Sequence, residues 1–129
     1  MKDKVALFVA SRDLAKAKDF AERFGAEDWF GDYEKPFGDE RVQAIDICLP
    51  RDLHLPTALK AFEAGKHVLT EKPMALNFDE AKQMVQAARK YGKLLAVAEN
   101  MQTYDHCTLA RQLILDGAKG SRLLTPMNK

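Results

Sequence analysis

The feature that most constrains the fold of this chain is the alternation of short apolar runs with stretches of helical periodicity. Val5–Ala10 is a continuous apolar run, which is typical of a strand buried on both faces of a sheet. Three further segments, mostly apolar, are also expected to be strands: Ala44–Leu49, His67–Pro73 and Leu94–Ala98. Amphipathic helical patterns lie between and after them, joined by short links. This order predicts one domain over residues 1–129, an α/β fold with a doubly wound parallel sheet and helices on both faces.

Capping residues and apolar periodicity predict where the helices begin and end. Gly25 is expected to end the first helix, and Asn77 begins the clearest one, with Glu80 three residues later as in a capping box. The side chains expected to face inward on the first and last helices are Leu14, Ala17, Ala21, Phe24, Leu109, Ala110, Leu113 and Ile114. Asp28–Phe30 is a short strand candidate, and Gly31–Glu40 reads as a loop with at most one helical turn. Ser121–Lys129 is at most a short strand and a tail.

The run His67–Pro73 ends in two charged residues and a proline. Pro73 cannot continue a central strand, so the strand stops there and delivers Glu71 and Lys72 to its carboxyl end. In open α/β sheets the carboxyl ends of the strands border the ligand crevice. The alternative is a plain strand end, with two solvated charges and a turn proline.

The composition excludes several classes of protein. The chain has 129 residues and a formal net charge of +1, so no electrostatic argument favours nucleic acid or an anionic membrane as a partner. No apolar run approaches the roughly 20 residues of a membrane span, and Met1–Lys4 does not resemble a signal peptide. Two cysteines far apart in the sequence favour reduced thiols over a disulfide and do not make a metal site. A cytoplasmic protein that binds no metal is expected.

The segment Gly65–Ala75, with its Glu71-Lys72-Pro73 core, resembles the signature of the Gfo/Idh/MocA family of NAD(P)-dependent sugar and polyol oxidoreductases. The resemblance runs from about Val5 to about Leu124 and includes the Leu49-Pro50 turn and the Ala98-Glu99-Asn100 strand end. It implies the Rossmann-like domain that binds the dinucleotide. It also implies a second domain, which in the family supplies most substrate contacts.

The resemblance assigns roles to residues at three strand ends. Lys72 matches a lysine beside the reacting carbon–oxygen centre of the substrate, where an ammonium can polarise a carbonyl. Glu71 would lie near the nicotinamide ribose, and the Lys72–Pro73 bond is expected to be cis. The remaining positions implied to line the cofactor are Leu49, Pro50, His54, Pro73 and Asn100. For His54, a helix-start residue that bonds only locally is an equal alternative.

Ser11 and Arg12 stand where the Val5–Ala10 strand ends. An acidic residue at this position binds the 2′-hydroxyl of the adenosine ribose, whereas a nearby Arg accommodates a 2′-phosphate. The Ser-Arg pair therefore favours NADP over NAD. The alternatives are that Arg12 is a solvated first-turn residue and that Asp13 is the N-cap of the helix.

The sequence lacks the glycine-rich turn that holds a dinucleotide pyrophosphate. None of its seven glycines forms a G-x-G-x-x-G motif. Compared with the family, the chain corresponds to a truncated sheet that starts at the second strand, so Val5–Ala10 and Ala44–Leu49 would each expose an edge. The two strands could pair directly, a partner chain could fill the gap, or two copies could associate around it. We expect direct closure or a homodimer.

Two function classes follow from this comparison. The chain is either part of an NADP-dependent oxidoreductase whose phosphate cradle comes from a partner, or a non-enzymatic half-Rossmann module for binding or assembly. Without the cradle, we expect weak or absent binding of NADP or NAD and no dehydrogenase activity of the chain alone. The sequence does not identify the substrate.

Overall fold

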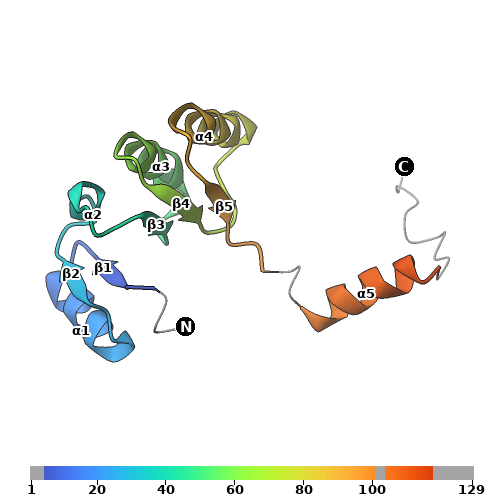
Figure 1. Cartoon of the computed structure of the whole chain (residues 1–129), viewed down its shortest axis with the longest axis horizontal. Coiled ribbons are helices and arrows are strands. Elements are labelled where there is room, and N and C mark those ends of the chain that lie inside the picture. The colour runs from blue at the N-terminus through green and yellow to red at the C-terminus, as the bar shows by residue number, and fades with distance from the viewer. Residues whose placement is uncertain (1–4, 101–103, 118–129) are drawn as a thin grey trace. The chain divides into compact units, whose positions relative to one another are not determined.

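The computed structural model describes residues 5–100 and 104–117, which fall in two compact units, Met1–Ala98 and Glu99–Lys129 (Figure 1). The first unit carries every strand of the described residues, and the second carries helix α5 (Asp105–Leu115). None of the helices in these ranges is long and apolar enough to cross a membrane. Each unit is described by itself.

The first unit opens with a β-α-β segment. Strand β1 (Phe8–Ala10), helix α1 (Leu14–Phe24) and strand β2 (Asp28–Phe30) follow one another, and the two strands pair in parallel. The Asp13 side chain accepts a hydrogen bond from the Lys16 backbone at 3.2 Å and so caps the start of α1. The segment forms a separate two-stranded sheet, with α1 packed against it.

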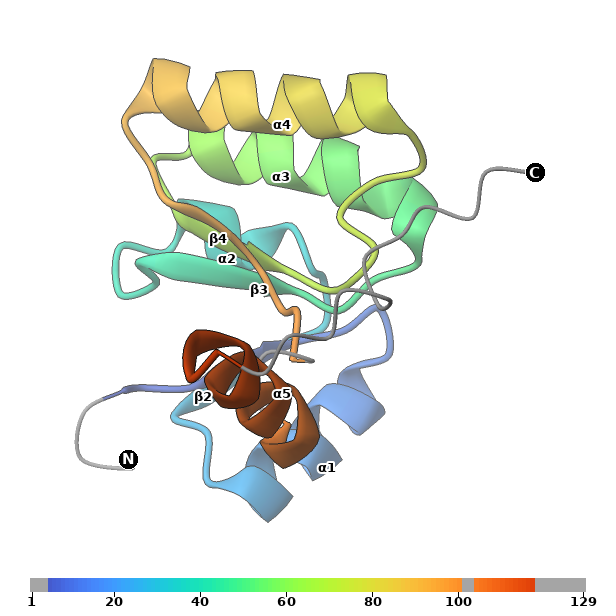
Figure 2. The same cartoon turned by 90° about the vertical axis from the view of Figure 1, so that its right-hand side faces the viewer.

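The rest of the first unit is a three-stranded parallel sheet in the order β3-β4-β5. Its elements, together with the short helix α2 that precedes them, are α2 (Lys35–Gly38), β3 (Ala44–Ile47), η1 (Arg51–Leu53), α3 (His54–Glu63), β4 (His67–Thr70), α4 (Phe78–Tyr91) and β5 (Leu95–Val97). Helices α3 and α4 lie side by side over one face of this sheet (Figure 2). The alternation of strands and helices therefore produces the predicted parallel α/β architecture.

The main hydrophobic core lies between the three-stranded sheet and the pair α3 and α4. Its buried members come from β3, α3, β4 and α4: Ile47, Ala58, Ala61, Phe62, Val68, Met84, Ala87 and Ala88. Helix α1 buries only Ala17 and Ala21 among its residues. The two halves of the first unit therefore differ greatly in buried apolar surface.

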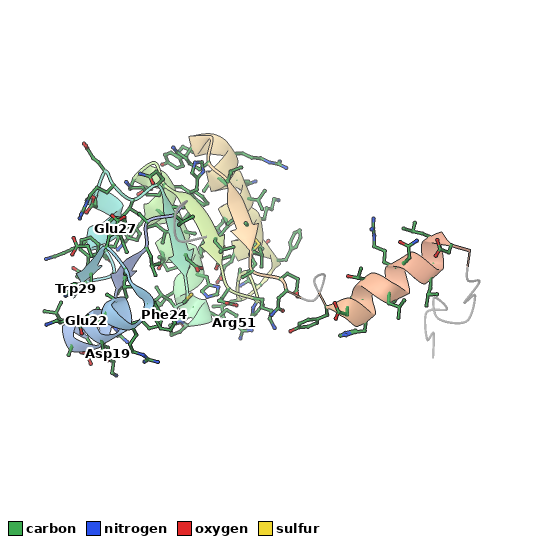
Figure 3. All side chains as sticks on the ribbon, turned by 60° about the horizontal axis from the view of Figure 1, so that its bottom comes forward. Asp19, Glu22, Phe24, Glu27, Trp29 and Arg51 are labelled. Carbon is green, nitrogen blue, oxygen red and sulfur yellow. The ribbon has the colours of Figure 1, made fainter. Side chains whose placement is uncertain are left out.

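The predictions of inward-facing side chains were confirmed for Ala17 and Ala21, which are buried, and wrong for the other positions at both ends of the chain. Leu14 and Phe24 of α1 are exposed, and Figure 3 labels Phe24 near the end of that helix. A two-stranded sheet is too narrow to cover the whole apolar stripe of α1. Leu109, Leu113 and Ile114 of α5 are exposed as well. The expectation for Ser121–Lys129 lies outside the described residues.

The predicted direct pairing between the first and third strands was also wrong. Strand β1 pairs with β2, and β3 pairs with β4, but no ladder joins β1 to β3 in the residues described. Arg41 contacts both halves of the unit, because its Nη2 donates to Asp28 at 2.9 Å and to Asp39 at 2.7 Å. This bridge links the sheets near the start of β2 and β3 while leaving their facing edges apart.

Candidate functional site

The carboxyl ends of the three neighbouring strands lie level. Ile47 pairs with Thr70, and Thr70 pairs with Val97. The register continues past the strands, because the backbone N–H of Glu71 donates to the Ile47 carbonyl at 3.1 Å and that of Ala98 donates to the Thr70 carbonyl at 2.8 Å. The chain therefore leaves all three strands at the same edge of the sheet.

The loop that follows β4 presents the charged residues of the predicted site. Glu71, Lys72 and Pro73 are exposed, and the Lys72–Pro73 peptide bond is cis, as expected. Glu71 Oε2 accepts a hydrogen bond from the Lys72 backbone N–H at 3.1 Å. Within residues 5–100 and 104–117, the Lys72 ammonium forms no ion pair. Its charge is therefore open to solvent or to a ligand.

His54 connects this loop to the turn after β3. Its side chain is 2% exposed, with Nε2 at 2.9 Å from the Leu49 carbonyl oxygen and Nδ1 at 3.3 Å from that of Met74. A neutral imidazole donates from one nitrogen, so the shorter contact fits a ring that is protonated on Nε2. Leu49 is half-buried and Pro50 is exposed beside it. His54 thus donates a hydrogen bond to the turn after β3, and its ring lies beside the loop that follows Lys72.

Ser11, Arg12 and Asp13 follow β1. The Ser11 backbone N–H donates to the Phe30 carbonyl at 3.0 Å, and Ser11 Oγ accepts from the Asp13 backbone at 3.1 Å. Asp13 is the N-cap of α1, as the alternative reading held. The Arg12 side chain is exposed and has no hydrogen-bond partner among the residues described. It is available for an anion.

Asn100 stands three residues beyond the end of β5 and is exposed. It belongs to the second unit, with Glu99. Its amide can donate and accept hydrogen bonds, which suits the role that the resemblance implies.

Asp46 and Cys48, which the sequence reasoning had not singled out, form a second polar group on β3 and just after it. Desolvation raises the pKa of the Asp46 carboxyl, its hydrogen bond with Cys48 lowers that pKa, and the charge of Glu71 raises it. Cys48 is exposed, but partial desolvation raises the pKa of its thiol, and the nearby carboxylates Asp46 and Glu71 raise it further. The charged Asp46 inside the otherwise apolar segment Ala44–Leu49 was the available signal, since buried strands of parallel sheets are mostly apolar.

The residues present fit one part of a dinucleotide and not another. Ser11 and Arg12 offer a hydroxyl and a cation at the end of β1, which suits a ribose with a 2′-phosphate. The pyrophosphate has no matching glycine turn in the sequence. The Asp13 carboxylate already accepts from the Lys16 backbone N–H at the start of α1, so this donor is not open to a pyrophosphate.

Comparison with known proteins places this site in context. Residues 3–99 match the family model GFO_IDH_MocA, described as an oxidoreductase family with an NAD-binding Rossmann fold. A trans-1,2-dihydrobenzene-1,2-diol dehydrogenase from Mus musculus is 35% identical over 112 residues, which cover 87% of this chain and 34% of that protein. The chain spans about a third of the length of the curated relatives it matches.

Solved structures agree with this match. A levoglucosan dehydrogenase in complex with NADH and levoglucosan aligns with a TM-score of 0.80 and 34% identity, covering 90% of this chain and 31% of that one. A 3-ketoreductase from Actinomadura kijaniata, in complex with NADP, aligns with a TM-score of 0.79 and 33% identity, covering 88% and 34%. The similarity therefore concerns the dinucleotide-binding part of these proteins.

Proposed function

Because this chain belongs to the Gfo/Idh/MocA family of oxidoreductases with an NAD-binding Rossmann fold, we propose that it contributes part of a hydride-transfer site for a sugar or polyol substrate. The observation that carries the proposal is the level edge of β3, β4 and β5. There Lys72 is exposed, and the buried His54 lies between the Leu49 turn and the loop that follows Lys72.

Lys72 is the proposed catalytic residue. Its ammonium would lie beside the substrate oxygen and stabilise the negative charge that develops when a carbonyl becomes an alkoxide. The nicotinamide cofactor, when bound, supplies or accepts the hydride. Glu71 would accept a hydrogen bond from a ribose hydroxyl. For Asn100, which belongs to the second unit, a role near the nicotinamide rests on the family resemblance alone.

The proposed cofactor is NADP, with Arg12 contacting the 2′-phosphate. An exposed ion pair of this kind contributes up to about 1 kcal/mol, or about fivefold in Kd. Each missing hydrogen bond to the pyrophosphate would cost about 1.5–3 kcal/mol, so the chain alone should bind the cofactor weakly. Productive hydride transfer would then depend on polypeptide that supplies the phosphate cradle and the substrate contacts.

Calorimetric titration of the purified chain with NADPH and NADH tests this proposal. We expect a Kd in the millimolar range, about −4 kcal/mol, with NADPH bound more tightly than NADH. Arg12→Ala should abolish the preference. Arg23→Ala, which removes an arginine of α1 paired with Asp19 at 3.5 Å, should leave it unchanged. Equal binding of the two cofactors by the unaltered chain would refute the role of Arg12.

A second candidate is a non-enzymatic module that binds or assembles with another polypeptide. The absence of a glycine-rich turn favours it, as does the open space between the two sheets. The same titration separates the candidates, because a module that has lost its chemistry gives no heat with either cofactor at millimolar concentration. Lys72→Ala would then leave every measured property of the folded chain unchanged.

A further inference from the structure

The buried imidazole of His54, at the start of α3, lies between two loops that leave the same edge of the sheet. Its Nε2 lies 2.9 Å from the carbonyl oxygen of Leu49, in the turn after β3. Its Nδ1 lies 3.3 Å from the carbonyl oxygen of Met74, two residues beyond Lys72. Each ring nitrogen therefore faces an oxygen that can only accept a hydrogen bond.

A neutral imidazole carries one N–H, so it can donate to only one of these two oxygens. With its proton on Nε2, the ring of His54 donates to the Leu49 carbonyl at the shorter distance. The lone pair on Nδ1 is then directed at the Met74 oxygen, and two acceptors face each other at 3.3 Å. In the neutral state, His54 therefore holds the turn after β3 and does not hold the loop that follows Lys72.

A protonated imidazole donates from both ring nitrogens, and histidine is the side chain that commonly gains a proton between about pH 5 and 8. The surroundings of His54 already place an acceptor at each nitrogen. Hydrogen bonds from a charged donor are stronger than those from a neutral one, and they oppose the cost of burying the charge. Protonation would therefore add a bond between His54 and the Met74 carbonyl.

The charges near His54 do not oppose this second bond. Charged side chains at the same end of the neighbouring elements come from η1, the loop after β4 and the start of α4: Arg51, Asp52, Glu71, Lys72, Asp79 and Glu80. The η1 pair and the loop pair each combine one positive and one negative charge, and the two carboxylates of α4 favour a cation. Asp46 of β3 lies on the opposite face of the sheet, because Ile47 beside it packs into the core. In the part of the chain that the structure describes, no ion pair involves the His54 ring.

We propose that His54 is a positioning residue that responds to pH: its neutral ring holds the Leu49 turn alone, and its protonated ring holds the Leu49 and Met74 carbonyls together. The second bond would tie the loop that carries Lys72 to the turn after β3. Closure in acid would restrict Lys72 relative to that turn, and hydride transfer requires such fixed geometry. The functional meaning of this closure rests on the proposed function, whereas the closure itself does not.

Nitrogen-15 NMR of the full chain without cofactor tests the proposal, because the shifts of ring nitrogens distinguish protonated from unprotonated positions. We expect one ring N–H for His54 at about pH 8, on Nε2, and two at about pH 5. Hydrogen exchange at the Met74 and Ala75 amides, corrected for the intrinsic effect of pH, should slow by at least about fivefold between the two values.

His54→Gln separates protonation from packing. The glutamine amide can donate to the Leu49 carbonyl from near the position of Nε2 but gains no proton in this range, so the pH response at Met74 and Ala75 should be lost. His106→Gln, which removes an exposed histidine of α5, is the matched control and should leave that response unchanged.

Three results would overturn the proposal. The first is a His54 ring that keeps a single N–H until the chain unfolds in acid. The second is a doubly protonated ring with no slowing of exchange at Met74 and Ala75. The third is equal slowing in the unaltered chain and in His54→Gln, which would assign the pH response to another group. Since every sample lacks cofactor, these outcomes are independent of the titration with NADPH and NADH.

Discussion

The carboxyl of Asp46 makes the stability of the folded chain depend on pH. Its residue is exposed on β3, but the carboxyl is partly desolvated by the surrounding strand, and this desolvation raises its pKa above the ordinary value of 3.8. The folded chain therefore holds this proton more tightly than the unfolded chain does. The favourable contribution is present below the ordinary pKa and is lost as pH rises through the folded-state pKa.

Asp46→Asn should remove that loss. The amide keeps an oxygen that can accept from Cys48 but carries no charge to desolvate. We expect the free energy of unfolding of the variant to exceed that of the unaltered chain at about pH 7, with a smaller difference at about pH 3, in urea denaturation at both values.

The free energies of unfolding of two variants must be compared, because other carboxyls change the stability of the chain with pH in the opposite direction. Hydrogen bonds from Arg41 lower the pKa of Asp28 and of Asp39, so their contribution is lost as pH falls. The pH dependence of the free energy of unfolding of the whole chain is the sum of all these contributions. Asp52→Asn, at an exposed carboxyl in η1, is the matched control and should show no comparable gain. A gain at pH 3 as large as at pH 7 would contradict the assignment.

At the scale of elements, α4 shows how local chemistry sets a boundary. The Asn77 side chain accepts from the Glu80 backbone N–H at 2.9 Å, and Glu80 Oε2 accepts from the Leu76 backbone N–H at 3.0 Å. Each side chain satisfies a backbone donor that the start of a helix leaves unpaired. Helix α4 in turn holds Met84 and Ala88 in the core.

Asn77→Ala should therefore destabilise the chain by about 1 kcal/mol in urea denaturation. Asp79→Ala is the control in the same turn. Its carboxylate caps no backbone group among the described residues, so its loss should cost less, a few tenths of a kcal/mol through the helix dipole. Equal effects of the two substitutions would mean that the cap contributes no more than the charge does.

Elements set by local chemistry were predicted well from the sequence. The bounds of α1 follow from Asp13 and Gly25, whose φ of 67° suits glycine, and those of α4 follow from Asn77 and Gly92. The roles of Lys72, Glu71 and Asn100 stay predictions that rest on the family. Strand pairing could not be read in this way, because the distance between β1 and β3 depends on contacts far apart in the sequence. The bridge from Arg41 to Asp28 is one of these contacts.

At the scale of the whole first unit, stability is distributed unevenly. The buried cluster of apolar residues lies within β3, β4, α3 and α4, whereas α1 buries Ala17 and Ala21. A two-stranded sheet is marginal by itself in water. The segment from β1 to β2 therefore needs contacts with the rest of the chain to stay folded. Because the edges of β1 and β3 do not pair, no strand ladder couples this segment to the larger core.

Two alanines allow this imbalance to be measured. Ala21 in α1 and Ala61 in α3 are both 0% exposed and lie within helices of similar length, so their amides differ mainly in the core beneath them. We expect the Ala21 amide to exchange at least about a hundredfold faster than the Ala61 amide, since the β1-α1-β2 segment can open without the larger core. Equal rates would show that the first unit unfolds as one cooperative body.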